Sequence, residues 1–452
     1  MPFAEDEMNA ADVSAGDTAW VLISAALVLL MTVGLAFFYG GMVRAKSVLN
    51  MVMMSVVTMG LIGVLWVLVG FSLVFGESIG GFIGNPMDFA GLTALLNEDA
   101  VVDGTPTLIF AGFQAAFAII AVALVSGAVA DRMRFSAWVV FAVVWALLVY
   151  FPAAHWVFAF NGSVSENGGF IANNLGAVDF AGGTAIHINA GAAALALALV
   201  LRPRIGFRRA PMRPHNLPLV MLGAGLLWFG WFGFNAGSAL GANHTAAFAW
   251  INTLAAPAAA MLAWLIVERI RDGRPTSLGA ASGVVAGLVG ITPAAAAVSP
   301  LGAIAIGTLA GIGSALAIGL KTKLGYDDSL DVVGVHLVAG LIGTLAIGVL
   351  ANPASPAGEA GLLHGGGLHL LGVEALSAAI VLVYSFVVTT VIALVLRSMM
   401  GGIRVTSHEE SFGIDVSAHA ESGYEFSQVP YTSQNITRSI VIPAPEQQEA
   451  RP

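Results

Sequence analysis

Eleven separate stretches of this chain are long and apolar enough to cross a lipid bilayer as helices. A helix needs about 20 mostly apolar residues to span roughly 30 Å of hydrocarbon. The 452 residues are 58% hydrophobic and only 10% charged, which indicates a polytopic membrane protein. The sequence therefore predicts an all-α membrane domain over residues 18–400. The expected spans are approximately 18–40, 48–74, 106–130, 135–151, 179–201, 217–239, 246–267, 278–297, 301–320, 331–350 and 371–396.

The basic residues divide the loops into two classes. All 18 Lys and Arg residues fall in alternate loops or in the C-terminal segment, and the other loops carry acids without bases. Positive side chains favour the cytoplasmic side. We therefore expect residues 1–17 outside, residues 401–452 inside as a cytoplasmic tail, and a multi-pass protein of the inner (plasma) membrane. The acidic outer face should attract cations, although the positive-inside bias alone explains the pattern equally well.

The order of the spans predicts an inverted repeat. Spans one to five begin outside, and spans six to ten begin inside, so equivalent helices run in opposite directions. This gives a 5+5 repeat plus one extra helix. The string His187-Ile-Asn-Ala-Gly in span five matches His336-Leu-Val-Ala-Gly in span ten. Inverted repeats place substrate sites near the bilayer midplane, at the interface between the two halves.

Each of these histidines follows an aspartate along the chain. Asp179 precedes His187 by eight residues, and Asp331 precedes His336 by five. If each pair shared one helix, the separations would be roughly 12 Å and 8 Å. An ionisable side chain at membrane depth is costly and indicates a functional site. A single buried histidine is more often a packing residue, but two related by a repeat predict one shared site.

A pair of imidazoles in an apolar lining has a limited chemistry. Two neutral rings can share a hydrogen bond, one as donor and one as acceptor. Their other nitrogens can contact a small polar molecule or pass a proton. We expect no metal or cofactor, because neither histidine has a second ligand three or four residues away, and catalytic zinc usually needs three. The pattern favours a narrow pore for a neutral or transiently neutralised solute.

Aromatic residues form a second pattern. Trp231, Phe234 and Ser238 lie on one helical face. Phe113 and Phe117 are four residues apart on another helix. Aromatic faces attract cations, and stacked phenyl rings block water. By spacing alone, core packing or an interfacial aromatic belt is the more common explanation.

Seven strings of residues recur in the order and spacing of a known family. They are Phe37-Phe-Tyr-Gly-Gly-Met-Val-Arg44, Phe113-Gln-Ala-Ala-Phe117, Ala130-Asp-Arg-Met-Arg-Phe-Ser136, Asp179-Phe-Ala-Gly-Gly-Thr-Ala-Ile-His187-Ile-Asn-Ala190, Pro214-His-Asn-Leu-Pro218, Trp231-Phe-Gly-Phe-Asn-Ala-Gly-Ser238 and Asp331-Val-Val-Gly-Val-His336. On these strings the chain resembles the ammonium transporter family, called Amt/Mep/Rh, to about residue 425. It is more similar to the bacterial ammonium transporter branch than to the Rhesus-type branch.

The resemblance implies a homotrimer of 11-helix protomers, each with its own pore, and a role for each matched residue. Those residues are Phe117 and Phe234 as a stacked gate; His187 and His336 as pore histidines; Ser238, Phe158, Phe117, Trp231 and Asp179 in ammonium recruitment; and Asp331 and Phe113 in support. Ammonium would be held at an outer vestibule and lose a proton. Ammonia would then cross, with or without a separately moving proton. No enzymatic activity is expected.

Two positions depart from the family pattern. Many members place a tryptophan above the gate, where this chain has Phe158, and Trp156 lies two residues earlier. Phenylalanine offers a weaker cation–π face than tryptophan, so ammonium capture should be weaker. Ala420 stands where the family commonly has glycine.

The C-terminal segment resembles the cytoplasmic regulatory tail of the family. The matching string is Gly413-Ile-Asp-Val-Ser-Ala-His-Ala-Glu421, with Gly413, Asp415 and His419 as its candidate regulatory residues. In bacterial relatives a PII-type signalling protein docks on this face, so such a partner is possible here. No nucleic-acid partner is expected.

Two other functions remain open at this point. A Rhesus-like channel for neutral ammonia would share the histidines but lack the vestibule cation site. An ammonium sensor would bind without significant flux, and sensors usually carry an appended signalling domain. The tail of about 50 residues is too short for a catalytic domain of typical size.

Overall fold

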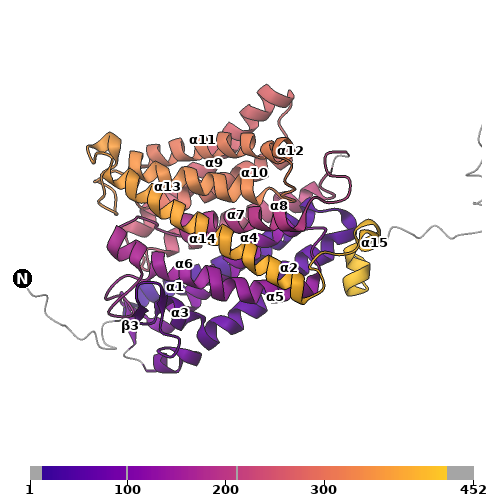
Figure 1. Ribbon diagram of the computed structural model, residues 1–452. Coiled ribbons are helices and arrows are strands. Elements are labelled where there is room, and N and C mark those ends of the chain that lie inside the picture. The colour runs from indigo at the N-terminus through magenta and orange to yellow at the C-terminus, as the bar shows by residue number, and fades with distance from the viewer. Residues whose placement is uncertain (1–12, 98–99, 210–211, 425–452) are drawn as a thin grey trace, which may run out of the picture.

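The computed structural model describes residues 13–97, 100–209 and 212–424, which form a bundle of long helices (Figure 1). The hairpin strand β3 (Val101–Val102) and the tail helix α15 (Ser407–Phe412) lie at opposite ends of this bundle. Within the part described, 11 helices are long and apolar enough to cross a membrane. Their number is as the sequence predicted. Residues 1–12 of the predicted outer N-terminal segment lie outside the described residues.

Each expected span is present, and several are built from consecutive helical pieces. The pieces are α1 (Ala15–Met42); α2 (Val48–Leu65), η3 (Trp66–Gly70) and α3 (Phe71–Phe75); α4 (Thr107–Val129); α5 (Phe135–Trp145), η5 (Ala146–Tyr150) and α6 (Phe151–Phe158); η7 (Gly183–Ile188) and α7 (Asn189–Leu201); α8 (Leu217–Gly237); α9 (His244–Asp272); α10 (Ser277–Ile291) and η8 (Thr292–Ala294); α11 (Pro300–Ala317) and α12 (Leu320–Leu324); η9 (Val333–Leu337) and α13 (Val338–Leu350); and α14 (His369–Met399).

The fourth span extends beyond its predicted end at residue 151, because a wide turn carries the helix past Pro152. Proline lacks an N–H and normally breaks a helix. Here the preceding turn η5 is a π-helix, in which the N–H of Phe151 donates to the carbonyl of Ala146. The chain then continues as α6 to Phe158. This extension carries Phe158 further toward the outer end of the span.

The two histidine helices begin later than predicted and begin alike. Both open with a π-helical turn, η7 and η9, instead of starting at residues 179 and 331. A residue with a positive φ precedes each turn. It is Gly182, with a φ of 110°, one residue before η7, and Asp331, with a φ of 63°, two residues before η9. Because these two segments have the same local backbone, they support the repeat that the sequence predicted.

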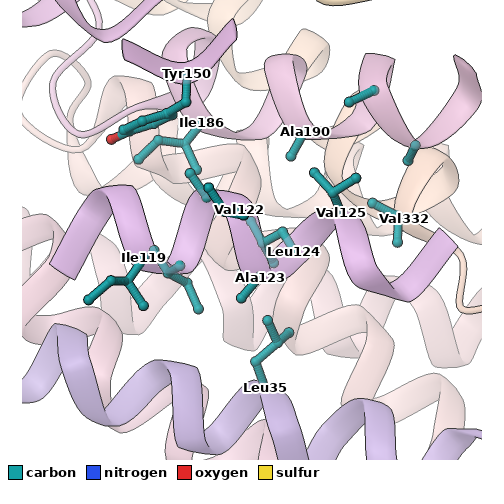
Figure 2. Close-up of a cluster of buried hydrophobic side chains, with 14 of the residues drawn as sticks. Leu35, Ile119, Val122, Ala123, Leu124, Val125, Tyr150, Ile186, Ala190 and Val332 are labelled. Carbon is teal, nitrogen blue, oxygen red and sulfur yellow. The ribbon is translucent and has the colours of Figure 1, made fainter. Parts of the chain in front are cut away.

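The contacts between these two helices are reciprocal. A Cβ at Gly191 would meet Leu337, and a Cβ at Gly340, the matching glycine, would meet Ile188. In the same way η7 packs against α13, and η9 packs against α7. Each N-terminal turn therefore packs against the body of the other helix, and the two helices cross where turn and body join, near Ile188 and Leu337. Figure 2 shows the apolar side chains around this crossing, including Ile186, Ala190 and Val332.

Charged side chains tie together the bundle end that carries the tail. Arg132 and Arg204 both pair with Asp327, with N–O distances of 2.9 and 2.8 Å. All three side chains are buried. Burial alone would raise the pKa of Asp327, but the hydrogen bonds and charge of Arg204 outweigh it and hold that pKa below its ordinary value. Glu410 of α15 pairs with Arg404 at 2.7 Å and lies 4.0 Å from Arg44, whose partner Asp131 also pairs with Arg204.

The tail folds back onto the second span. The carboxylate of Asp415 accepts hydrogen bonds from the backbone N–H groups of Leu49 and Asn50, at 3.0 and 2.8 Å. These are free N–H groups in the first turn of α2, so Asp415 caps that helix. His419 contacts Asn50 at 3.1 Å. Ala420 has a φ of 55°, a left-handed conformation that glycine would adopt without strain.

Small residues allow α11 and α9 to pack closely. Gly307 and Gly311 lie four residues apart on α11, as in the small-xxx-small motif of membrane helices. A Cβ at Gly307 would lie 2.0 Å from the carbonyl oxygen of Ala256, and one at Gly311 would lie 2.4 Å from that of Ala260. Such distances leave no room for a side chain without moving one helix.

We predict that Gly307→Ala will destabilise the bundle. The added methyl group must push α11 from the backbone of α9, which costs about 1–3 kcal/mol for an overpacked core. The measurement is thermal unfolding of the protein in detergent. Gly372→Ala in α14 is the matched control, because a Cβ there meets nothing within 4 Å. Equal melting temperatures for the two variants would contradict the close packing described above.

Candidate functional site

A cavity of about 420 Å³ opens beside the hairpin of β3 and β4 (Thr105–Pro106), at the end of the bundle opposite the tail. We call it the outer vestibule. Five residues singled out from the sequence line it, namely Phe113, Phe117, Phe158, Asp179 and Ser238. Asp103 lies in the same lining, which contains no Lys or Arg among the residues that the structure describes. The vestibule therefore combines aromatic faces with acidic groups, a combination that favours a cation.

Asp179 caps the helix that carries His187. One carboxylate oxygen accepts the N–H groups of Gly182 and Gly183, at 2.8 and 2.7 Å. The other accepts those of Thr184 and Ala185, at 2.8 and 3.2 Å. These are the first N–H groups of the helix, which have no partner within the helix itself. The carboxylate thus stabilises a helix start inside the protein and leaves its negative charge at the vestibule wall.

Ser238 is oriented as an acceptor. Its hydroxyl donates to the carbonyl of Phe234 at 2.8 Å. A hydroxyl has one proton to donate and two lone pairs. With the proton engaged in the helix, the lone pairs of Ser238 are available to the vestibule it lines.

Two phenylalanine rings close the floor of the vestibule. Phe117 and Phe234 are stacked, with centroids 4.2 Å apart and planes 15° from parallel. Both side chains are buried. Phe113 packs on Phe117 with a centroid distance of 4.8 Å. The stack leaves no open passage to water in this conformation, so any solute that passes must displace a ring.

The two histidines lie beyond this stack. The Nδ1 atoms of His187 and His336 are 3.3 Å apart, and the ring centroids are 5.3 Å apart. A hydrogen bond between two Nδ1 atoms requires one ring to donate and the other to accept. The Nε2 atom of His187 is buried and has no partner among the described residues.

A small cavity of about 10 Å³ lies beside the imidazoles, enough for about one water-sized molecule. Apart from the two histidines, its lining is hydrophobic, with Leu35, Phe38 and Val285 among the side chains. The space beside the histidines is therefore narrow, and no charged side chain is among the described residues that line it.

A model of the Ammonium Transporter Family matches residues 19–424 of the chain. The chain belongs to the ammonium transporter family. An ammonium transporter of Mycobacterium tuberculosis is 58% identical over 433 residues, which cover 91% of each chain. The structure of Mep2 from Saccharomyces cerevisiae aligns with a TM-score of 0.83 at 31% identity, covering 92% of this chain and 93% of Mep2. A structure described as a sensor Amt protein aligns with a TM-score of 0.82 at 31% identity, covering 89% of this chain and 98% of that one.

The chain is thus an ammonium transporter of the cell membrane, and the prediction of its family from the sequence is confirmed. Individual site residues differ in how well the sequence analysis placed them. The vestibule, the stack and the histidine pair are assembled from the residues expected. Two other residues, Trp231 and Asp331, lie in surroundings that differ from those expected.

Trp231 does not line the outer vestibule. Its ring stacks on His187 at a centroid distance of 5.5 Å, and its Nε1 donates to the hydroxyl of Thr292 at 2.9 Å. It lies seven residues before Ser238 on α8, roughly 10 Å lower along the helix axis. Trp231 and Ser238 lie on the same face of α8, which runs along the pore. Ser238 therefore lines the vestibule, whereas Trp231 lies beside the histidines. Trp231 holds the imidazole in place and does not contact the vestibule.

Trp156 also lies away from the vestibule. Its side chain is only 4% exposed, and its Nε1 donates to the carbonyl of Phe82 at 2.8 Å. Its ring packs edge-on against Tyr384 of α14. Trp156 therefore anchors an outer loop, and Phe158 and Phe160 are the aromatic residues near this helix end that line the vestibule.

Asp331 is not the counterpart of Asp179. Asp328 is, because it precedes His336 by eight residues and its carboxylate accepts the N–H of Val333 at 2.7 Å. Val333 lies five residues after Asp328, as Thr184 lies five after Asp179. The side chain of Asp331 points elsewhere and pairs with Lys321. Asp328 therefore holds the position that corresponds to Asp179, and the supporting role expected of Asp331 stays a prediction.

Asp328 lies at the inner end of the pore, in a loop outside the spans. Burial first, and the neighbouring carboxylate of Asp331 second, raise the pKa of Asp328 to about 6. The transporter thus has one buried carboxylate at each end of the histidine pair.

Sequence reasoning missed Asp328 and one further acid, Glu374. Glu374 lies within α14, is fully buried, and accepts the N–H of Val178 at 2.7 Å. It therefore fixes the backbone next to Asp179. An ionisable residue inside a span is itself a signal of function, and this signal was present in the sequence.

We predict that Asp179→Ala will unfold far more easily than the parent transporter. The change leaves four N–H groups of a buried helix start without their acceptor, at a cost of about 3 kcal/mol or more. Asp179→Asn is the control, because its amide oxygen can still accept part of that set. Thermal unfolding in detergent should rank the parent first, Asn second and Ala last. A melting temperature of the Ala variant equal to the parent's would contradict the capping role.

Proposed function

We propose that the transporter captures the ammonium ion at the outer vestibule, removes one proton, and conducts neutral ammonia past the phenylalanine stack and the histidine pair. The observation that carries this proposal is the order of the three parts. An acidic, aromatic vestibule comes first, a closed apolar stack second, and two hydrogen-bonded imidazoles third.

Capture rests on complementary contacts. The faces of Phe117 and Phe158 offer cation–π attraction, worth about 0.5–2 kcal/mol according to solvation. The lone pairs of Ser238 accept an N–H of the ion. Asp179 attracts the ion through its negative charge without binding it directly, because its oxygens already accept hydrogen bonds from the backbone.

Loss of the proton follows from the apolar passage. Moving an unpaired ion into such surroundings costs far more than moving a neutral molecule with hydrogen-bonding groups. Ammonia can donate to a bare imidazole nitrogen and accept from a protonated one. The unpartnered Nε2 of His187 is the group available for this contact. The hydrogen-bonded pair also offers a path for a separate proton, which would make transport electrogenic.

The vestibule favours this function over its two alternatives. A channel for neutral ammonia alone has no use for an acidic aromatic cavity, and Ser238 and Asp179 both favour a cation. A sensor would use the same capture site but would show little flux. Flux measurements therefore separate the three functions.

We further propose a homotrimer and a cytoplasmic regulator of the PII type. The family resemblance supports the trimer. Basic side chains at the inner mouth, including Arg208 and Arg209, support docking of a partner with acidic groups. The folded tail, held by Asp415 and Glu410, would form part of that docking face.

The proposal predicts that His187→Ala and His336→Ala will each abolish selective ammonium transport while the protein remains folded. Each change removes one partner of the imidazole pair and enlarges an apolar cavity. Currents on solid-supported membranes after an ammonium jump measure electrogenic transport, and an entrapped pH dye measures electroneutral flux. Undiminished flux with full selectivity in both variants would refute the role of the pair.

The vestibule geometry predicts that Phe158→Trp will lower the half-saturating ammonium concentration. The larger ring adds about 0.5–1 kcal/mol of cation–π attraction, or roughly two- to fivefold. Trp156→Phe is the matched control, because that indole is buried against Tyr384 and does not line the vestibule. The assignment of Phe158 fails if Trp156→Phe raises the half-saturating concentration and Phe158→Trp leaves it unchanged.

A further inference from the structure

The two mouths of the pore are alike in size and opposite in charge. The inner mouth is a cavity of about 430 Å³, against about 420 Å³ for the outer vestibule. The outer lining contains acids and no Lys or Arg. The inner lining contains Lys321, Arg204, Arg208 and Arg209, with Asp331 as its single acid. The two mouths are built from related segments of the repeat, but the outer mouth is lined by acidic side chains and the inner mouth mainly by basic ones.

The difference is localised at one repeated position. Asp179 and Asp328 are equivalent helix caps, and the residue three places after each has a positive φ. At the outer mouth this residue is Gly182, which has no side chain. At the inner mouth it is Asp331, whose carboxylate pairs with Lys321. The inner mouth therefore carries an ion pair where the outer mouth carries none.

The backbone of Asp331 is strained, which indicates that its side chain has a function. Its φ of 63° is a left-handed conformation that costs a residue with a Cβ about 1 kcal/mol or more. Glycine would adopt it without strain, as Gly182 does at the outer mouth. Residues held in such conformations cluster at functional sites.

Lys321 is well placed to neutralise the acids of the inner mouth. Its ammonium group donates to the carboxylate of Asp331 and, at 3.0 Å, to the backbone carbonyl of Asp328. Arg204, the nearest buried base in the same lining, is already engaged by Asp327 and Asp131. The amine of Lys321 thus lies against the carboxylate of Asp331 and the backbone carbonyl of Asp328, on the inner side of His336.

We propose that Lys321 is a tethered cation that occupies the ammonium position at the inner mouth and so prevents recapture of ammonium from the cytoplasmic side. The primary amine of Lys321 is chemically a substituted ammonium ion, with N–H donors like those of the substrate. The tethered amine competes with free ammonium for the inner site, and free ammonium must exceed the effective concentration of the amine to displace it. The transporter therefore binds ammonium well at the outer mouth and poorly at the inner one.

This inference rests on the proposed conduction function and adds a direction to it. Thermodynamics still sets the net flux by the gradient. What the ion pair changes is the concentration at which each face saturates. The expected result for the parent transporter is a higher half-saturating ammonium concentration at the inner face than at the outer face.

The test uses the full chain in proteoliposomes of known orientation, with ammonium jumps applied to one face at a time. Initial flux is read as current and with an entrapped pH dye. Lys321→Gln removes the tethered cation and leaves Asp331 free, so the ratio of inner to outer half-saturating concentration should fall about three- to fivefold. Lys323→Gln is the matched control, since Lys323 is exposed and does not line the inner mouth.

A second variant separates this role from simple structural support. Asp331→Gly relieves the backbone strain, removes the acid and leaves the charge of Lys321, so the ratio should rise. If the ion pair only held the fold together, Lys321→Gln and Asp331→Gly would break it equally and shift the ratio in the same direction. That result, or a parent ratio near one, overturns the proposal. Lys321→Met serves as a replacement if the Gln variant does not fold.

Absence of flux from outer-face jumps in the parent would instead refute the proposed conduction function. The two failures are therefore distinguishable. Outer-face flux tests whether the protein conducts ammonium, and the inner-to-outer ratio tests whether Lys321 holds the inner site.

Discussion

The capping of two helix starts inside the bundle is the interaction on which the pore depends. A helix that begins at membrane depth exposes N–H groups that neither lipid nor apolar side chains can satisfy. Asp179 supplies acceptors for four of them, and Asp328 performs the same task at the other end. These caps allow the two histidine helices to begin within the protein, one at each end of the pore. The imidazoles meet because each helix start packs against the body of the other helix.

The same two carboxylates give the pore its electrostatics. A cap that uses backbone N–H groups leaves its negative charge in place, so each end of the histidine pair has an acidic neighbour. At the outer end no basic side chain lines the vestibule, whereas at the inner end Lys321 pairs with Asp331. Aspartate therefore both caps the helix starts and supplies negative charge for a cation. The two halves of the repeat differ because only the inner mouth has the Lys321–Asp331 ion pair.

Much of the fold and part of the site could be predicted from the sequence. The number of spans follows from the length of apolar stretches, which is a local property. The histidines stood out because charge-bearing residues are rare at that depth, and Phe117 and Phe234 came from the resemblance. Prediction failed at Pro152, where a π-helical turn carried the span onward, and at the starts of the histidine helices, where caps replaced the first expected turn.

The sequence by itself determined which helices cross the membrane, and which residue types could form a vestibule, a gate and a proton-accepting pair. Only the tertiary structure decided that Trp231 supports His187, that Trp156 is buried against α14, and that Asp328 is the partner of Asp179. The reason is physical. Apolar length acts on each helix separately, whereas a side chain's partner depends on which backbone N–H groups and rings lie within a few ångströms, and helices far apart in the chain determine that.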